Sequence, residues 1–231
     1  METILFDVDD TLYDQLQPFK LAFEKKFQHI KDLPIDQLFI SSRKHSDRLF
    51  NQSEAGTISL LELHTYRLMA ACQEFGLEIS QDDAIEIQKT YEEEQQKITL
   101  VPEVECLLEH LYQEGKQLGI LTNGPYEHQL RKINQLGLGK WIPDEHIFIS
   151  SAIGAAKPAH EAFQFVEKKL RLNRDKTVYI GDSFDNDVIG AKQAGWNSIW
   201  MNHRGRTMPN STFLPDQIVH THKELWQLFL L

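Results

Sequence analysis

Three carboxylates, Asp7, Asp9 and Asp10, stand within four positions of the stretch ILFDVDDTL at residues 4–12. Such a cluster is costly unless something positive lies among its members, because like charges repel one another. The apolar residues before Asp7 are typical of a buried strand, which puts the acidic residues at its end. In an extended chain Asp7 and Asp9 point to the same side, so both carboxylates can act on one bound molecule.

Polar groups that suit phosphate or a metal ion recur further along the chain. In order they are Thr122 and Asn123 in GILTNG, Lys157 in GAAKPAH, and Asp182, Asp185, Asn186 and Asp187 in YIGDSFDNDVIGA. The carboxyl ends of parallel strands meet at one edge of a sheet, so we expect these groups to converge on Asp7 and Asp9. Carboxylates without His or Cys beside them make an oxygen site that suits Mg²⁺ better than zinc.

The chemistry that these residue types predict is the transfer of a phosphoryl group to a carboxylate. Asp7 would attack the phosphorus, while Mg²⁺ and Lys157 offset the negative charges that meet there. Asp9 would protonate the leaving oxygen and later deprotonate the water that hydrolyses the aspartyl-phosphate. A hydroxyl, backbone N–H groups beside a glycine and a lysine suit a phosphate dianion.

An alternation of predicted strands and helices must position these residues. Strands are predicted at residues 3–8, 117–121, 146–149, 177–180, 198–201 and 217–219, and helices at 104–114, 126–135, 161–169, 185–194 and 223–230. This alternation predicts an α/β fold with a doubly wound parallel sheet, a Rossmann-like core that binds ligands beyond the carboxyl ends of its strands.

A helical block interrupts this alternation after the first strand. Residues 16–98 show helical periods only, with breaks near Pro34, Gly56 and Gly76, and Ser80 is expected to cap the next helix. We therefore predict four helices and no strand in this block. The expected domains are an α/β core of residues 1–15 and 99–231 and an inserted all-helical domain of residues 16–98.

Length and composition bound the class of protein. The chain has 231 residues, 41% of them hydrophobic, and a formal charge of −10. That charge argues against a nucleic-acid polymer as partner, and no stretch approaches the roughly 20 apolar residues of a membrane span. The N-terminus shows no signal-peptide pattern, so we expect a cytoplasmic protein without a membrane partner. A monomer and a homodimer both stay open.

Four motifs stand in order along the chain: Asp7-x-Asp9-x-Thr11, Thr122-Asn123, Lys157-Pro158 and Gly181-Asp182-Ser183-x-x-x-Asp187. Each motif alone is a weak or moderate signal, but the ordered set is highly specific. It resembles the haloacid-dehalogenase superfamily of phosphohydrolases, in the subgroup that carries a helical cap after the first strand. The resemblance covers essentially the whole chain, and it implies that residues 16–98 form the cap domain that sets specificity.

The resemblance also implies a role for each motif residue. Mg²⁺ would be held by the carboxylate of Asp7, the backbone carbonyl of Asp9 and the carboxylate of Asp182. The residues implied to lie one layer further from the metal are Asp187 and Thr11, and those implied to bind the substrate phosphate are Thr122, Asn123 and Lys157. Lys157 would steady the nucleophile as well as the phosphate.

We therefore expect a Mg²⁺-dependent hydrolase of phosphoric monoesters that acts on a small phosphorylated metabolite, a nucleoside monophosphate or a sugar phosphate. Three alternatives stay open: a phosphoglucomutase-like transferase, a 2-haloacid dehalogenase and a non-catalytic regulatory module. A dehalogenase of this family attacks carbon without a metal, and the presence of Asp9 together with Asp182 speaks against it. Asp10 stands where the commonest family pattern has Gly, a variant that argues against the mutase and leaves phosphatase chemistry intact.

Overall fold

The computed structural model describes residues 1–28, 30 and 32–230. They form two compact units, a core unit of residues Met1–Asp14 and Thr99–Leu231 and a helical unit of residues Gln15–Ile98. All the candidate site residues lie in the core unit. The two units are described one at a time below.

A six-stranded parallel sheet forms the centre of the core unit, with the strand order β3-β2-β1-β4-β5-β6. The strands are β1 (Thr3–Phe6), β2 (Gln117–Thr122), β3 (Ile147–Ile149), β4 (Thr177–Gly181), β5 (Asn197–Met201) and β6 (Gln217–Val219). Because β1 lies between β2 and β4, the residues that follow these three strands emerge next to one another at one edge. The predicted α/β fold with a parallel Rossmann-like sheet is confirmed.

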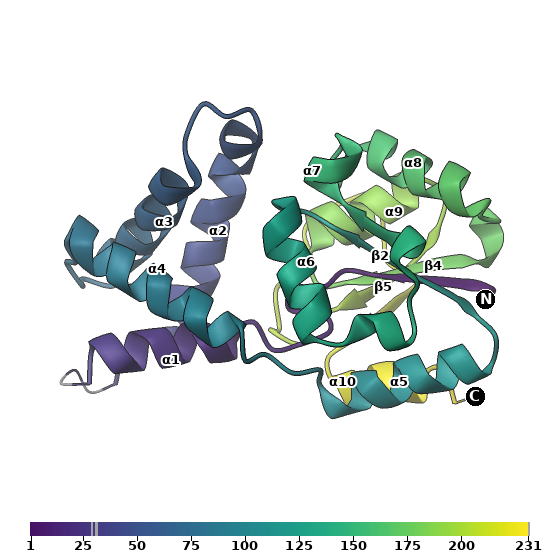
Figure 1. The fold of residues 1–231 in the computed structure, drawn as a ribbon, viewed down its shortest axis with the longest axis horizontal. Coiled ribbons are helices and arrows are strands. Elements are labelled where there is room, and N and C mark those ends of the chain that lie inside the picture. The colour runs from purple at the N-terminus through teal and green to yellow at the C-terminus, as the bar shows by residue number, and fades with distance from the viewer. Residues whose placement is uncertain (29, 31, 231) are drawn as a thin grey trace. The chain divides into compact units, whose positions relative to one another are not determined.

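Helices cover both faces of this sheet, with α5 and α10 on one face and α8 and α9 on the other (Figure 1). The α-helices are α5 (Pro102–Gln113), α6 (Tyr126–Gln135), α7 (Ser150–Ile153), α8 (His160–Leu170), α9 (Gly190–Gln193) and α10 (His222–Gln227). Short 3₁₀ turns are η1 (Leu138–Lys140), η2 (Asp144–His146) and η3 (Arg174–Lys176). The short helix α7 and these turns were not predicted, because segments of three or four residues carry too little periodicity to detect.

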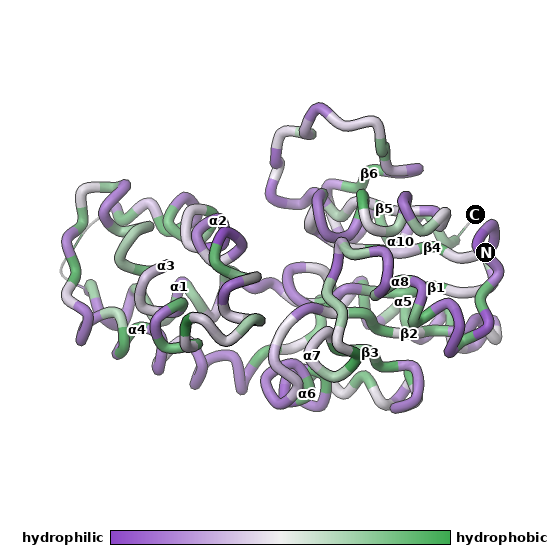
Figure 2. Tube along the Cα trace, turned by 90° about the horizontal axis from the view of Figure 1, so that it is seen from above, coloured by the Kyte–Doolittle hydropathy of each residue, from purple (hydrophilic) through white to green (hydrophobic). Residues whose placement is uncertain are grey.

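The sheet is held by apolar side chains on both of its faces. Ile4, Leu5 and Phe6 of β1 have no exposed surface, as expected of a central strand covered on both sides. Leu5 belongs to a cluster that joins β4 to helices α8 and α9, with Tyr179 and Phe163 among its members. Figure 2 shows hydrophobic residues along the strands and an alternation of hydrophobic and hydrophilic residues along the helices.

The segment predicted as one α-helix at residues 185–194 differs in the structure. A π-helical turn, η4 (Phe184–Ile189), comes first, and α9 follows it. The side chain of Ser183 accepts from the N–H of Asn186 at 3.3 Å, and the carboxylate of Asp187 accepts from the N–H of Ser183 at 2.8 Å. These local bonds hold the wider turn and direct Asp187 back toward the end of β4, and π-helical turns are frequent at functional sites.

The helical unit contains four helices in its described residues and no strand, as predicted. They are α1 (Leu16–Lys26), α2 (Ile35–Glu54), α3 (Leu60–Glu74) and α4 (Gln81–Gln95). Ser80 begins α4 with a capping box to Asp83, which confirms the predicted cap, and Ser59 begins α3 in the same way with Glu62. The interior is aromatic, with the ring of Phe19 stacked on Phe23 at 4.5 Å between centroids.

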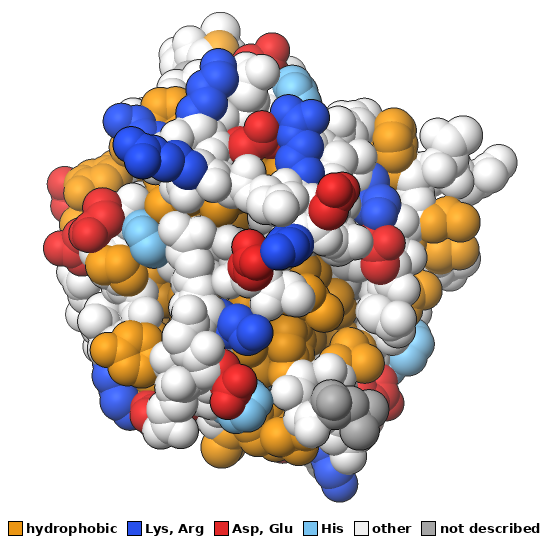
Figure 3. Space-filling view, turned by 90° about the vertical axis from the view of Figure 1, so that its right-hand side faces the viewer, with side chains coloured by type: hydrophobic (Ala, Val, Ile, Leu, Met, Phe, Trp, Pro, Cys, Tyr) orange, Lys and Arg blue, Asp and Glu red, His pale blue; other side chains and the backbone are white. Residues whose placement is uncertain are grey.

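Among the described residues, every helix falls short of the length and apolarity that crossing a bilayer demands. On the face of the molecule seen in Figure 3, Lys and Arg side chains are interspersed with Asp and Glu side chains. Mixed charges of this kind are typical of the surface of globular proteins.

Gly119 of β2 offers a test of how tightly the sheet is packed. A methyl group there would lie 2.7 Å from Cδ2 of Leu5 and 3.0 Å from the carbonyl oxygen of His146. We expect Gly119→Ala to lower the free energy of unfolding by about 1–3 kcal/mol, because an overpacked core forces its neighbours to shift. Gly139→Ala is the control, since nothing lies within 4 Å of a methyl group added there. Urea denaturation measures both, and equal midpoints for the two variants would contradict this packing.

Candidate active site

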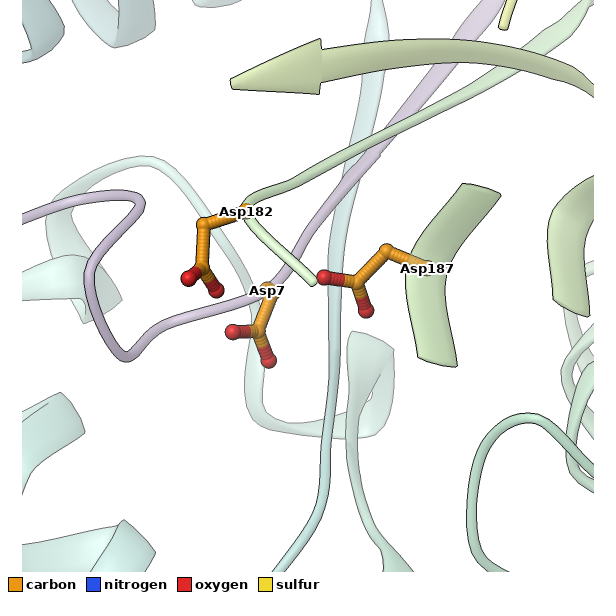
Figure 4. Close-up of side chains that lie close together, drawn as sticks. All are labelled: Asp7, Asp182 and Asp187. Carbon is orange, nitrogen blue, oxygen red and sulfur yellow. The ribbon is translucent and has the colours of Figure 1, made fainter. Parts of the chain in front are cut away.

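Asp7, Asp182 and Asp187 meet at the carboxyl ends of β1 and β4. Asp7 directly follows β1, and its N–H donates to the carbonyl of Ile180 at 2.9 Å. Asp182 directly follows β4, and Asp187 lies on η4. Each offers a carboxylate oxygen, and these three oxygens lie within 4.8 Å of one another. Figure 4 shows the three carboxylates side by side, so the structure brings together aspartates that are far apart in the sequence.

Lys157 connects two of these carboxylates. Its Nζ donates to Oδ1 of Asp7 at 2.8 Å and to Oδ1 of Asp187 at 2.7 Å. It also donates to the hydroxyl of Tyr179 at 2.7 Å, which in turn donates to the carbonyl of Leu121. Burial alone would lower the pKa of Lys157, but the carboxylates of Asp187 and Asp7 raise that pKa well above its ordinary value. Lys157 therefore stays a cation in the site.

Asp7 is almost fully buried, at 6% exposure. Burial raises the pKa of Asp7 to about 6, because the charged form loses its hydration. The negative charges of Asp187 and Asp9 add to the rise, and Lys157 opposes it. The protein's own cations thus leave the charge of Asp7 only partly compensated.

Asp182 has its own cation, Arg206, which comes from the loop after β5. Nη1 of Arg206 lies 2.9 Å from Oδ2 of Asp182. The pKa of Asp182 is nevertheless raised well above its ordinary value, mainly by burial, with Arg206 opposing the rise. The backbone carbonyl of Asp182 accepts from the indole N–H of Trp200 at 2.8 Å, which fixes the turn at the end of β4.

The carboxylate of Asp9 is bound by residues of helix α6. Nζ of Lys132 donates to both of its oxygens, at 2.6 and 2.8 Å, and Nε2 of Gln129 donates at 2.9 Å. The hydroxyl of Tyr13 donates to Oδ1 at 2.5 Å. Burial alone would raise the pKa of Asp9, but Lys132 and these bonds hold it well below its usual range. In this arrangement Asp9 is a carboxylate, a form that can accept a proton but has none to donate.

Asp10 is bound by basic side chains of the loop after β5. Arg204 grips it with two hydrogen bonds, from Nε at 3.0 Å and from Nη2 at 2.7 Å, and Nε2 of His203 lies 3.3 Å from Oδ2. The φ angle of Asp10 is 56°, in the left-handed region that favours glycine. A side chain in that conformation persists where the surroundings hold it, and here the buried ion pairs do so.

The hydroxyl groups of Thr122 and Thr11 are buried and have no hydrogen-bond partner in the structure. A buried unpaired polar group costs about 1–3 kcal/mol, so a bound molecule that pairs with one would gain from it. Asn123, by contrast, uses its amide on the backbone of Lys157. Its Nδ2 donates to the carbonyl at 2.8 Å, and its Oδ1 accepts from the N–H at 2.9 Å. The side chain of Asn123 thus fixes the Lys157 segment, and its assignment to the substrate phosphate stays a prediction.

The composition of this site fits Mg²⁺, because the three converging ligand atoms are all carboxylate oxygens. Among the described residues, five aspartates at the ends of β1 and β4 form ion pairs, namely Asp7, Asp9, Asp10, Asp182 and Asp187. Four described cationic side chains pair with them, namely Lys132, Lys157, Arg204 and Arg206. These five carboxylates outnumber the four lysine and arginine side chains that pair with them, and Arg204 is shared with a sixth carboxylate, Asp14. The raised pKa values of Asp7 and Asp182 come mainly from burial, and neighbouring aspartates add to the rise, so a divalent cation bound here would lower both pKa values.

Several residues that touch the site were not identified from the sequence. They are Tyr13, Gln129, Lys132, Arg204 and Arg206. Gln129 and Lys132 lie three residues apart on α6, a spacing that puts them on one helix face. The segment HRGR at residues 203–206 follows the predicted strand at 198–201, so a search for polar residues after each strand could have found both arginines.

The raised pKa of Asp7 predicts how stability depends on pH without metal. Native Asp7 keeps its proton up to about pH 6, whereas an unfolded aspartate loses it near about pH 4. The native state therefore binds more protons in this window, and unfolding becomes easier as pH rises through it. We expect Asp7→Asn to melt above wild type at pH 7.5 in chelator, with the difference vanishing near pH 4.

Thermal melts at several pH values check this, with Asp185→Asn as the control for net charge because Asp185 is exposed. If Asp7→Asn melts at or below wild type at every pH, burial does not dominate the pKa of Asp7.

A comparison with protein families finds that residues 1–195 match the haloacid dehalogenase-like hydrolases. Among curated relatives, YfnB of Bacillus subtilis is 30% identical over 202 residues, which cover 87% of this chain and 83% of YfnB. A glyceraldehyde 3-phosphate phosphatase of Methanothermobacter thermautotrophicus is 24% identical over 87% of this chain and 86% of its own length.

Solved structures agree with this family match. The crystal structure of YfnB bound to magnesium has a TM-score of 0.72 at 27% identity and covers 100% of this chain and 99% of its own. An L-2-haloacid dehalogenase of Xanthobacter autotrophicus has a TM-score of 0.72 at 17% identity, over 100% of this chain and 98% of its own, a likeness of fold alone. Since the family match extends over most of its length, the chain belongs to the haloacid dehalogenase-like hydrolases.

Proposed function

We propose that this hydrolase is a Mg²⁺-dependent phosphatase that cleaves small phosphorylated metabolites through an aspartyl-phosphate at Asp7. The observation that carries the proposal is the meeting of Asp7 with Asp182 and Asp187, with Lys157 bound between two of the three. Relatives named for glyceraldehyde 3-phosphate and phosphoserine support a small phosphomonoester as substrate. Sugar phosphates and nucleoside monophosphates are therefore the first substrates to test.

Mg²⁺ would be held by the carboxylates of Asp7 and Asp182 and by the backbone carbonyl of Asp9. Asp187 is assigned a supporting position, because both of its oxygens already accept hydrogen bonds, from Lys157 at 2.7 Å and from the N–H of Ser183 at 2.8 Å. When bound, the ion supplies positive charge that offsets the repulsion between the carboxylate and the phosphoryl group.

Asp7 is the proposed nucleophile. Lys157 occupies its Oδ1, so Oδ2 is the oxygen assigned to attack the phosphorus. As the new P–O bond forms, the bond from phosphorus to the leaving oxygen breaks, and the phosphoryl group stays on Asp7. The unpaired hydroxyl of Thr122 is the proposed donor for a phosphoryl oxygen. The three N–H groups of Lys157 are engaged by Asp7, Asp187 and Tyr179, so Lys157 contributes its positive charge beside the phosphoryl group.

Asp9 is proposed to move the protons of both steps. In the second step it accepts a proton from the water that attacks the aspartyl-phosphate, and its contact with Lys132 keeps it in the ionised form that this needs. In the first step the leaving oxygen takes a proton that Asp9 must first take up, from solvent or from a phosphate group bound as its monoanion, and Lys132 opposes this protonated form of Asp9. Leaving groups that depart without a proton should therefore depend least on Asp9.

Phosphate release from p-nitrophenyl phosphate tests the proposed reaction. We expect turnover by the wild type with Mg²⁺, loss of turnover in chelator, and loss of at least about 10³-fold for Asp7→Asn, because the nucleophile is gone. Asp185→Asn, an exposed carboxylate of the same region, is the matched control and should keep its turnover. A panel of nucleotides, sugar phosphates and phosphorylated acids then ranks substrates by kcat/KM.

Three results would contradict the proposed phosphatase. One is substantial hydrolysis by folded Asp7→Asn with Mg²⁺ present. Another is halide release from 2-chloropropionate in chelator without any phosphate release, which would instead indicate a dehalogenase. The third is a strict need for a sugar bisphosphate primer, which would indicate the mutase.

Asp9→Asn should separate the two steps of the reaction. Because p-nitrophenolate is a good leaving group that needs no acid, the variant should release about one equivalent of p-nitrophenol rapidly and then turn over slowly. With an alkyl phosphate such as glycerol phosphate both steps need Asp9, so no burst is expected. Stopped-flow absorbance at millisecond resolution follows p-nitrophenol from the aryl ester, and a quenched-flow assay of released glycerol follows the alkyl ester. A slow release without a burst on the aryl ester would remove Asp9 from its assigned role.

A further inference from the structure

The loop after β5 has an ordered structure, and it places the side chains of Arg204 and Arg206 at the candidate active site. Asn202 opens the loop, and its backbone N–H donates to the carbonyl of Val219 on β6 at 2.8 Å. The side chain of Asn202 bonds to both backbone groups of Arg206, accepting from its N–H at 2.8 Å and donating to its carbonyl at 2.9 Å. The loop is thereby closed on itself and fixed to the sheet, which sets where Arg206 starts.

Arg206 reaches from this loop to Asp182 and holds it at two points. Its Nη1 lies 2.9 Å from the carboxylate oxygen Oδ2 and donates to the backbone carbonyl of Asp182 at 3.1 Å. Its Nη2 is 3.8 Å from Oδ2 of Asp10, but that carboxylate already has two shorter hydrogen bonds from Arg204. Asp182 is therefore the main partner of Arg206.

The two cations of the site differ in how firmly they are enclosed. The side chain of Lys157 is 3% exposed and connects three polar groups, whereas the side chain of Arg206 is 31% exposed. A long, half-exposed side chain can shift toward water while its stem stays packed, and a fully enclosed one cannot. Of these two side chains, Arg206 is therefore the one that can move away from its partner carboxylate, that of Asp182.

We propose that Arg206 is a resident counter-cation of Asp182 that competes with the divalent ion for this carboxylate. This inference rests on the proposed function, because it takes Asp182 as a ligand of Mg²⁺. Two cations on one carboxylate repel each other, so Arg206 lowers the affinity of the site for Mg²⁺. In return it stabilises the metal-free protein, in which Asp182 would otherwise lie buried among other aspartates without a counter-charge.

Removing the charge of Arg206 tests this competition. We expect Arg206→Met, which keeps the stem and loses the charge, to bind Mg²⁺ on the order of 10-fold more tightly in isothermal titration calorimetry. Arg206→Lys, which keeps the charge but lacks the guanidinium fork, should lie between Arg206→Met and wild type. Arg174→Met is the control for net charge. Arg174 pairs with Glu167 and precedes the amino end of β4, whereas the site lies at the carboxyl end of that strand.

Thermal melts give a second readout that is independent of turnover. Without metal, Arg206→Met should melt below wild type, and saturating Mg²⁺ should close most of that gap. A merely structural role would lower the melting temperature equally with and without Mg²⁺, and that result would overturn the inference. Unchanged or weaker Mg²⁺ binding by Arg206→Met would overturn it as well.

The same titration separates this inference from the proposed function. If the wild type binds Mg²⁺ and hydrolyses phosphomonoesters but Arg206→Met binds no more tightly, the competition is wrong and the phosphatase stands. If the wild type neither binds Mg²⁺ nor hydrolyses these esters, the proposed function fails and the inference fails with it.

Discussion

Five aspartates gather after β1 and around the end of β4, where burial denies most of them the hydration that would stabilise their charges. Much of the local structure can be understood as the balancing of this charge. Lys157 forms ion pairs with Asp7 and Asp187. Lys132 pairs with Asp9, and Arg204 pairs with Asp10. An uncompensated buried charge costs far more than a single hydrogen bond contributes, so each pairing constrains the segments that supply it.

These counter-charges come from parts of the chain that only the fold brings together. Lys132 lies on helix α6, Lys157 in the loop before α8, and Arg204 in the loop after β5. The parallel sheet makes this possible, because each of its strands releases the chain at the same edge. The site therefore depends on the whole core unit. A substitution that displaces one of these segments would remove the counter-charge of a carboxylate on another segment.

The fold was predictable from the sequence because apolar strand-like runs and helical periods alternate along the chain, even where a strand is only three residues long. The six strands and the four helices of residues 16–98 follow from alternation and from breaks at Pro and Gly. The π-helical turn η4 was not predictable, because a continuous helix has the same apolar pattern, and the side chains of Asp187 and Ser183 that bond to the backbone N–H groups of Ser183 and Asn186 carry no periodic signal. Element ends are set by such local bonds, which is why they are the less predictable part.

For the site, residue type and strand ends predicted which side chains gather, but they did not predict the partners of each side chain. The gathering of Asp7, Asp182 and Lys157 follows from strand ends and could be predicted. Asn123 could not, because an amide suits a phosphate and a backbone equally well, and only the structure gives it the backbone of Lys157. The partners of Asp9 were not predictable either, because a single sequence does not indicate that Asp9 pairs with a lysine on α6.

Asp10 shows how a departure from a family pattern can be explained by a second segment. A non-glycine residue in the left-handed region costs roughly 1 kcal/mol, so an isolated aspartate at this turn would be a disadvantage. The two hydrogen bonds from Arg204 offset that cost, and they also tie the turn after β1 to the loop after β5. Glycine at this position would relieve the backbone but leave Arg204 without this buried partner. Asp10 and the basic segment HRGR are therefore best understood together, because their ion pairs connect the end of β1 to the end of β5 across the intervening strand β4.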